Sequence, residues 1–327
     1  MNWFLNQLPL ESKIAFCFSD PAGANACIAL AAMIDVAGYE KPILFSNSDY
    51  KGAIEHSFII SKVQEVPDWD SLDVDMIFTG TSHPDSSHNF EVRCIRRAKE
   101  LRKPVISFID HWINFSLRFG DLPIEFLPDS IWVIDEGARK LALAEGLPAE
   151  KVVISGNPYQ YYLKNIWKSS FTGKQYLNTI GIGSYSKYLL FAPDPISLRL
   201  GKQQVGFTEY EVVEELISYV STVDKDAVLI IKLHPLQPLP EFERLAETIT
   251  TKVILLKQAV NLPELLKAVD LVIGFYSNVL LDAMAVGTKV IRYFPGKEEY
   301  DLLNQATIVV PAISRWEDLK SALKKSI

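Results

Sequence analysis

The sequence predicts an α/β protein made of two Rossmann-like, doubly wound parallel-sheet domains that face a cleft. Short apolar runs rich in Val, Ile and Leu alternate with helical segments along the chain, which is typical of βα units in parallel sheets. A Ser-, Gly- and Thr-rich stretch at 168–187 interrupts this alternation. With 327 residues, the chain is long enough for one domain on each side of the interruption.

The first domain is predicted to begin with a βα unit. The apolar run 13–19 is followed by a turn that starts at Asp20 and by the small-residue helix 24–37. Gly38 ends this helix, because glycine tolerates the positive φ found at helix C-termini. The remaining strands are predicted at 42–45, 76–79, 105–109, 131–134 and 152–155, with helices at 89–102 and 136–145.

The second domain resumes the alternation after the interruption. Its strands are predicted at 188–192, 227–231, 252–256, 271–273, 289–293 and 307–310. Its helices are predicted at 210–220, 241–249, 262–268, 279–286 and 315–325. We therefore expect domains at 1–168 and 187–327 joined by a linker at 169–186, with the option that the last helix packs back on the first domain.

Composition and charge exclude several classes of protein. The net charge of −7 argues against a nucleic-acid partner, which requires a basic face. No apolar run reaches the length of a membrane span, and no cleavable signal pattern is present. Cys17, Cys27 and Cys94 lack metal-binding spacing, so we expect reduced core thiols. The expected location is cytoplasmic, with at most peripheral contact to the inner face of the membrane.

The segment from Lys232 to Pro235 directly follows the predicted strand 227–231. Lys232 and His234 therefore lie at the carboxyl end of a buried parallel strand, where open α/β sheets bind their ligands. A cation and an imidazole at this place suit an anion such as phosphate. The alternative is a solvated lysine and a surface histidine. We favour the anion site because a second one is predicted in the same domain.

That second site is the segment from Gly274 to Asn278, between strand 271–273 and helix 279–286. Gly274 permits close backbone approach, and Ser277 or Asn278 can cap the helix. The free N–H groups and the dipole at the helix start attract phosphate. Asp282, one turn further along, is within reach of a ribose hydroxyl. Capping alone is the alternative, although capping and anion binding are compatible.

The turn after the first strand carries a carboxylate, Asp20, and small residues up to Asn25 that leave room for a substrate. The turn has too few glycines for a dinucleotide fingerprint, so NAD and FAD are disfavoured. Asp20 can accept a proton from an attacking hydroxyl group. Its alternative role is that of a turn or helix N-terminal residue.

Another polar cluster follows strand 105–109. Asp110, His111 and Trp112 are expected to bind or orient a polyol, with the indole as a stacking platform. Since neighbours on an extended segment point to opposite sides, at most one of Asp110 and His111 should face the ligand. The separated His83 and His88 do not make a metal pair, so no metal and no cofactor is expected.

Taken together, three segments resemble glycosyltransferases of the GT-B fold. The block 262–291 is similar to the donor-binding segment of that fold, which holds the phosphates of a nucleotide sugar at the helix start and the ribose near Asp282. The segment 135–158 resembles the end of the acceptor domain. Residues 232–235 resemble the His-Pro motif of bacterial sialyltransferases, polysialyltransferases and CDP-polyol phosphotransferases, where the histidine serves the donor phosphate. The resemblance implies that 1–168 binds the acceptor and 187–327 the nucleotide donor.

These observations predict a metal-independent, inverting glycosyltransferase. It would move a sugar from a CMP- or UDP-linked donor to a cell-surface glycan or a small-molecule acceptor. Asp20 would be the general base, with His111 as second choice, and His234 would stabilise the leaving phosphate. The expected donor-binding residues are Lys232, Gly274, Ser277, Asn278 and Asp282, and the expected acceptor-binding residues are Asn25, Asp110 and Trp112.

Two alternatives remain. A sugar-nucleotide 2-epimerase would share the fold and the phosphate site. It would need several acids and histidines around the sugar ring, and a chain with five histidines offers few. A nucleotide-sugar-binding protein without turnover is the other alternative.

Overall fold

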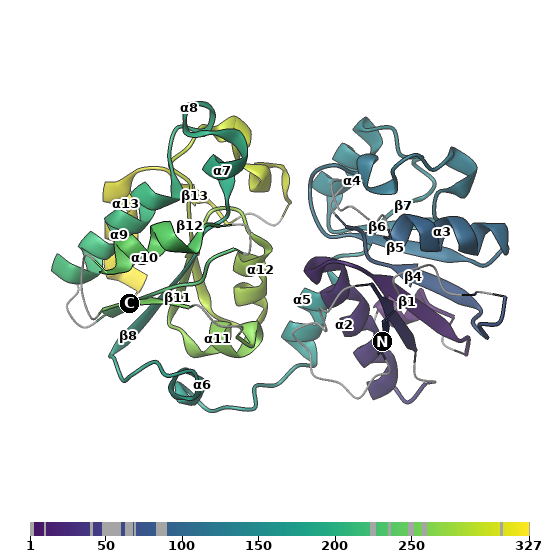
Figure 1. Cartoon of the computed structure of the whole chain (residues 1–327), viewed down its shortest axis with the longest axis horizontal. Helices are drawn as coiled ribbons and strands as arrows, with labels where there is room; N and C mark the ends of the chain where they lie inside the picture. The colour runs from purple at the N-terminus through teal and green to yellow at the C-terminus, as the bar shows by residue number, and fades with distance from the viewer. Residues whose placement is uncertain are drawn as a thin grey trace. The chain divides into compact units, whose positions relative to one another are not determined.

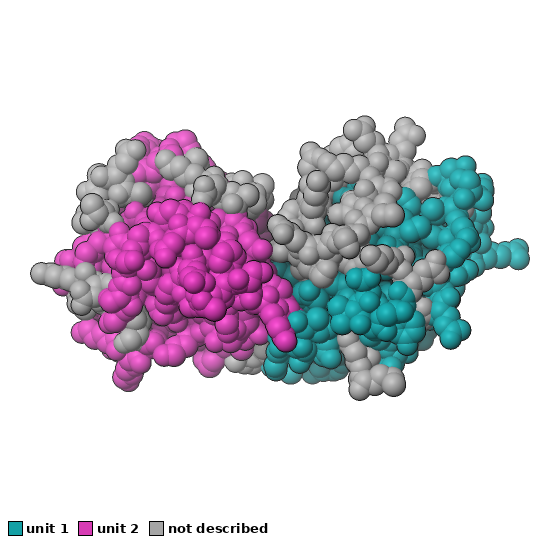
Figure 2. Space-filling view, turned by 90° about the horizontal axis from the view of Figure 1, so that it is seen from below, with its two compact units in different colours: residues 1–166, 305–308 teal, residues 167–304, 309–327 magenta. Residues whose placement is uncertain are grey.

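The computed structural model describes residues 3–9, 11–39, 42–47, 60–62, 68, 70–82, 90–222, 227–234, 237–247, 252–256, 260–307 and 310–326. The chain divides into two compact units (Figure 2), each with its own parallel sheet. Unit 1 comprises Met1–Ile166 and Gln305–Ile308, and unit 2 comprises Trp167–Asn304 and Val309–Ile327. The predicted linker 169–186 and the last helix therefore belong to unit 2.

Unit 1 contains a seven-stranded parallel sheet in the order β3-β2-β1-β4-β5-β6-β7. Its strands are β1 (Ile14–Phe18), β2 (Ile43–Ser46), β3 (Ile60–Lys62), β4 (Met76–Thr79), β5 (Val105–Ile109), β6 (Ser130–Val133) and β7 (Val152–Ile154). Every residue of β1, β4 and β5 is buried, which explains why these segments are apolar without alternation. The strand order reverses between β1 and β4, so these two strands flank the switch point of the sheet.

Helices flank this sheet (Figure 1). The longest, α2 (Pro21–Val36), starts three residues earlier than predicted, because Asp20 caps it and Pro21 occupies its first turn. It ends before Gly38, whose φ of 80° confirms the predicted stop. The other helices of unit 1 are α1 (Trp3–Asn6), α3 (Phe90–Glu100), α4 (Glu136–Ala144), α5 (Pro158–Asn165) and the short 3-10 turns η1 (Leu117–Phe119) and η2 (Ile124–Phe126).

Unit 2 contains a six-stranded parallel sheet in the order β10-β9-β8-β11-β12-β13. Its strands are β8 (Lys187–Ala192), β9 (Ala227–Ile231), β10 (Val253–Leu255), β11 (Leu271–Gly274), β12 (Lys289–Tyr293) and β13 (Ala312–Ile313). The helices are α6 (Gln175–Thr179), α7 (Ile196–Leu200), α8 (Lys202–Val205), α9 (Glu209–Thr222), α10 (Leu239–Glu247), α11 (Leu262–Ala268), α12 (Asn278–Ala285) and α13 (Trp316–Ser326), with 3-10 turns η3 (Glu298–Tyr300) and η4 (Leu302–Gln305). The order reverses between β8 and β11, as it does between β1 and β4 in unit 1. The prediction of two Rossmann-like doubly wound sheets is thus confirmed.

Of the strand predicted at 307–310, the structure describes Thr307 and Val310, and neither residue lies in a strand. The backbone N–H of Thr307 donates to the Asp135 carboxylate of unit 1 at 2.7 Å, so this residue is held by a side chain and not by a sheet. The last strand of unit 2 is β13, a few residues later, where it pairs with β12. Residues 308 and 309 lie outside the described part of the chain.

Among the residues that the structure describes, no helix has both the length and the apolar character needed to cross a lipid bilayer.

Candidate functional site

In unit 1, the loops after β1 and β4 touch at the switch point of the sheet. A Cβ atom added to Gly80, which follows β4, would lie 2.5 Å from the Cα atom of Gly23 in α2. Only glycine allows this approach, since real Cβ atoms do not come so close to backbone. The contact places the polar residues after β1 beside those after β4.

Asp20 sits in the first of these loops. Its Oδ1 atom accepts a hydrogen bond from the Gly23 N–H at 2.8 Å and so caps α2. Burial, together with the nearby Asp110 and Glu91 carboxylates, raises the pKa of Asp20 from 3.8 to about 7. The Gly23 N–H and the Arg118 guanidinium oppose this shift in the pKa. The two roles proposed for Asp20, capping and proton transfer, are therefore compatible at one residue.

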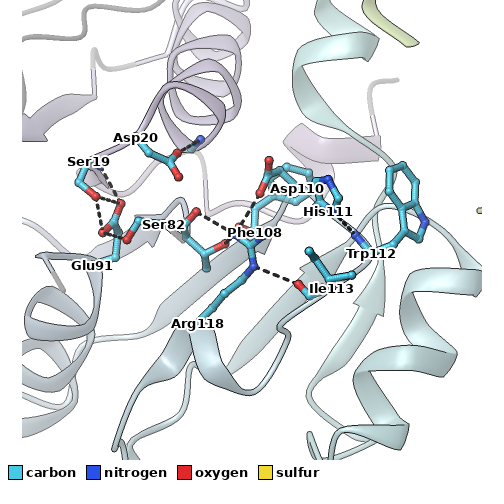
Figure 3. A network of polar contacts seen from close by, with 12 residues as sticks. Ser19, Asp20, Ser82, Glu91, Phe108, Asp110, His111, Trp112, Ile113 and Arg118 are labelled. Atoms are coloured by element: carbon cyan, nitrogen blue, oxygen red, sulfur yellow. Dashed lines mark hydrogen bonds and ion pairs between the residues drawn. The ribbon is translucent and has the colours of Figure 1, made fainter. Parts of the chain in front are cut away.

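Glu91, in the first turn of α3, links the two loops by hydrogen bonds and lies below Asp20 in the view of Figure 3. Its carboxylate accepts hydrogen bonds from the Ser19 N–H at 2.7 Å, from the Ser19 hydroxyl at 2.7 and 2.8 Å, and from the Ser82 hydroxyl at 3.0 Å. Burial raises the pKa of Glu91, and these hydrogen bonds act against the rise. Sequence reasoning missed this residue, because an acidic residue in the first turn of a helix is usually a solvated one.

Asp110 follows β5, the strand next to β4, and is 8% exposed. Its Oδ1 atom lies 3.3 Å from the Nη1 atom of Arg118, a buried residue of η1. The same Nη1 atom donates to the carbonyl and the hydroxyl of Thr81 after β4, each at 3.3 Å. Three strand-end loops of unit 1 thus converge on one group of carboxylates with one guanidinium (Figure 3). Arg118 was also missed, since no strand-end signal marks it.

The other residues predicted for unit 1 have different surroundings. His111 is half-buried, and its Nδ1 atom accepts the N–H of Trp112 at 3.0 Å. Trp112 is 2% exposed and its indole N–H donates to Asp135 at 2.9 Å, so the ring is part of the core and does not present a face for stacking. Asn25 lies half-buried in the second turn of α2.

In unit 2, Lys232 and His234 follow β9 as predicted. Both are half-buried, and burial lowers the pKa of Lys232. Burial, with Arg199 and Lys232 nearby, lowers the pKa of His234 from 6.5 to about 4, so the imidazole is neutral at pH 7 and can only act there as a hydrogen-bonding group. Gln237 exchanges hydrogen bonds with the His234 backbone and fixes the turn. Pro235 lies outside the described residues.

The segment after β11 has the predicted backbone features. A Cβ atom at Gly274 would lie 3.2 Å from the Ala192 carbonyl oxygen, so β11 and the end of β8 approach closely there. Ser277 caps α12 by accepting the Val279 N–H at 3.3 Å, and Asn278 is the first residue of the helix. Asp282, one turn later, is 6% exposed, so the protein covers most of its carboxylate.

Asp194, just past β8, is a further residue of this region that sequence reasoning missed. Its Oδ2 atom accepts the Tyr276 N–H at 3.4 Å. Burial raises the pKa of Asp194 to about 7, against hydrogen bonds from Tyr276 and Ser277 and the charge of Arg199. The strand-end rule that identified Lys232 applies equally to Asp194, two residues after β8. Residues after β9, β8 and β11, three neighbouring strands, therefore meet at one edge of the sheet.

Within the described residues, no group of three or more His, Cys, Asp and Glu side chains is arranged to hold a metal ion.

No protein-family model and no curated protein sequence matches the chain. Solved structures do. The UDP-GlcNAc 2-epimerase of Methanocaldococcus jannaschii matches with a TM-score of 0.61 at 12% identity, over 95% of this chain and 92% of that one. The UDP-GlcNAc 2-epimerase of Neisseria meningitidis, bound to UDP-GlcNAc, matches with a TM-score of 0.61 at 12% identity, over 96% and 90%. Anabaena HepE in complex with UDP matches with a TM-score of 0.60 at 13% identity, over 96% and 89%.

These comparisons overturn the expected glycosyltransferase, because the structures named above whose activity is stated are 2-epimerases. They favour the alternative of a sugar-nucleotide 2-epimerase and give no support to the His-Pro resemblance to sialyltransferases. Both expectations rested on strand-end anion sites, and a fold that offers such sites does not determine which reaction is catalysed. At this level of identity the likeness concerns architecture: the chain has the GT-B fold, with two Rossmann-like domains.

Proposed function

We propose that this protein is a nucleotide-sugar 2-epimerase that acts on a UDP-linked sugar. The observation that carries the proposal is the group of buried carboxyl groups at the strand ends of unit 1, in which Asp20 has a pKa of about 7. A carboxyl group with such a pKa is both a proton donor and a proton acceptor at neutral pH. The objection that the chain has few histidines is met by the acids Asp20, Glu91 and Asp110.

The chemistry of epimerisation requires two proton transfers. The C2–H bond breaks on one face of the sugar, and a new C2–H bond forms on the other face. One carboxylate accepts the first proton, and one carboxylic acid supplies the second. We assign the first role to Asp110 and the second to Asp20, because its pKa of about 7 leaves Asp20 able to donate a proton at neutral pH.

A C2 proton is only weakly acidic, so its removal needs a place for the electron pair. If the C1–O bond to the diphosphate breaks in the same step, the electron pair forms a C1=C2 double bond and the negative charge passes to the diphosphate. When C2 then receives a proton on its other face, a diphosphate oxygen forms the C1–O bond again and the epimeric nucleotide sugar results. We assign the diphosphate to unit 2, where the Lys232 cation and the positive end of the α12 dipole, at Ser277, would stabilise its charge. His234, neutral at pH 7, would donate a hydrogen bond.

An epimerase has no acceptor substrate, which changes the roles expected from the sequence. Asp110 becomes an acid-base residue, and Asn25 becomes a candidate contact to the sugar ring. Trp112 keeps the structural role that its burial gives it.

Deuterium exchange tests the proposal directly. UDP-GlcNAc incubated with the protein in D2O should acquire deuterium at C2 and convert in part to its C2 epimer, which proton NMR detects. Asp20→Asn should lower the exchange rate by roughly 100-fold or more, the usual contribution of a general acid or base. Asp121→Asn, a matched change at an exposed carboxylate, should have no effect. Absence of both deuterium and epimer with the wild-type protein would refute the activity on this substrate.

A further inference from the structure

Arg118 links two of the strand-end loops that carry the carboxyl groups of unit 1. The residue is 8% exposed, and its Nη1 atom contacts Asp110 Oδ1, the Thr81 carbonyl and the Thr81 hydroxyl at 3.3 Å each. Its Nε atom donates to the Ile113 carbonyl at 3.4 Å. Thr81 in turn donates to the Phe108 carbonyl of β5 at 3.1 Å. A single guanidinium therefore fixes the loops after β4 and β5 relative to each other (Figure 3).

The charges around Asp20 do not balance if every group is ionised. Among the described residues, the charged groups that act on Asp20 are Asp110 after β5, Glu91 on α3 and Arg118 on η1. The Asp20 charge also acts on the Cys27 thiol of α2. Burial raises the pKa of that thiol well above its ordinary value, so the thiol stays neutral. Three carboxylates and one guanidinium would leave an excess of negative charge in a buried region, so the group retains a proton.

The contacts of each carboxyl group indicate where that proton resides. Glu91 accepts hydrogen bonds from three donor groups, the Ser19 N–H and the Ser19 and Ser82 hydroxyls, which favour its ionised form. Asp110 is beside the Arg118 guanidinium. Within the described part of the chain, Asp20 has the Gly23 N–H as its hydrogen-bond donor. Asp20 is thus the least compensated of the three.

We propose that Arg118 is a positioning residue: it holds the Asp110 carboxylate in place with its positive charge beside it, so that Asp20 is the member of the pair that carries the exchangeable proton. In one turnover Asp110 gains the proton that leaves the substrate and Asp20 loses the proton that the substrate receives. Exchange with solvent, or the reverse reaction, restores the starting distribution. The inference rests on the proposed function for its catalytic meaning, but its electrostatic content can be measured without substrate.

The Asp20 titration can be isolated by a mutant cycle. In the folded protein the pKa of Asp20 lies above its unfolded value, so the free energy of unfolding falls as pH rises between the two values. The difference in unfolding free energy between a protein and its Asp20→Asn counterpart, followed in urea from pH 5 to pH 9, gives the midpoint of this titration. We would measure it for the wild type, Arg118→Met and Arg118→Lys. The control is Arg96→Met, whose guanidinium pairs with the exposed Asp121 at 3.1 Å.

Arg118→Met should move the midpoint upward by about one pH unit, the effect of removing one nearby opposite charge. Arg118→Lys should largely restore it, and adding Asp110→Asn to Arg118→Met should lower it again. Arg96→Met should leave it unchanged. The alkaline limb of the pH profile for C2 deuterium exchange should move with the midpoint. If Arg118→Met does not fold, the same comparison of wild type and Arg118→Lys, each with and without Asp110→Asn, still tests the coupling.

The possible results separate the two proposals. A merely structural Arg118 would lower stability equally at every pH, and an unmoved midpoint would overturn the positioning role even in an active epimerase. A midpoint that moves as expected in a protein without C2 exchange would refute the epimerase while supporting the control of the Asp20 proton by Arg118.

Discussion

Burial, more than residue type, determines the pKa of several single residues of this protein. Burial raises the pKa of Asp20 and of Asp194 to about 7 and lowers the pKa of His234 to about 4. The sequence identifies Asp20 and His234 as candidates, because each follows a strand, but it does not reveal their protonation. A histidine expected to stabilise a phosphate by charge is instead a neutral hydrogen-bonding group at pH 7.

His234 gives a pH-dependent prediction. Its folded-state pKa of about 4 is below the ordinary 6.5, so the unfolded chain binds the proton more readily. The free energy of unfolding should therefore fall as pH decreases from about 6.5 toward 4. His234→Gln, which cannot be protonated, should lose less stability over this range. Urea denaturation at several pH values measures the difference, and equal slopes for the two proteins would contradict the assignment.

The buried ion pair between β12 and the following turns gives a second prediction. Arg292 donates to both carboxylate oxygens of Asp301, at 3.0 and 2.7 Å, and both residues are almost fully buried. Asp301→Ala leaves the buried guanidinium without its carboxylate partner and should cost about 3–5 kcal/mol of unfolding free energy. Arg315→Ala, at an exposed pair with Asp318, should cost less than about 1 kcal/mol in the same denaturation assay. A loss for Asp301→Ala as small as that for Arg315→Ala would argue against the buried pair.

At the scale of elements, the sequence predicted the long, fully buried strands well. Strands β1, β4, β5 and β9 lie within a residue of their predicted bounds, since full burial demands apolar residues throughout. The short β3 was missed, and the final strand was placed too early, because two- or three-residue strands depend on their neighbours for pairing. Helix α5 was also missed, although its Asn157 cap and Pro158 are a recognisable start signal.

The contact between Gly23 and Gly80 is a testable property of two elements. A Cβ atom at position 80 would lie 2.5 Å from backbone, so Gly80→Ala must displace the loop that carries Asp20. We expect a loss of about 1–3 kcal/mol in unfolding free energy and a fall in C2 exchange. Gly183→Ala is the matched control, since the nearest atom there is 3.9 Å away. Full stability and full activity of Gly80→Ala would show that the loops are not in contact.

At the scale of the whole molecule, each unit has its own sheet and its own group of strand-end residues. The sequence predicted both sheets from the alternation of segments and placed Lys232, Ser277 and Asp20 at strand ends. It did not distinguish a transferase from an epimerase. The epimerase proposal rests on the structural neighbours and on the acids that meet in unit 1. Glu91 joins those acids, and Arg118 binds one of them, only through tertiary packing.

Ligand binding gives a prediction for the whole chain. UDP at about 100 times its dissociation constant should add roughly 2.7 kcal/mol to the unfolding free energy and raise the melting temperature. Lys232→Met should reduce this effect, because it removes a half-buried cation from the proposed diphosphate site. Lys164→Met, at an exposed lysine of α5, is the control. A melting temperature that UDP does not change would contradict the nucleotide site.

The sequence by itself determined the architecture of this protein and the edges of its sheets where chemistry is possible, because burial on both faces leaves a pattern that every parallel strand must show. Tertiary structure decided which polar residues act together and in which protonation state. Burial raises the pKa of Asp20 to about 7, the Asp110 and Glu91 carboxylates add to the rise, and Arg118 opposes it. These groups come from three other elements, and the energy of a buried charge depends on all its neighbours at once.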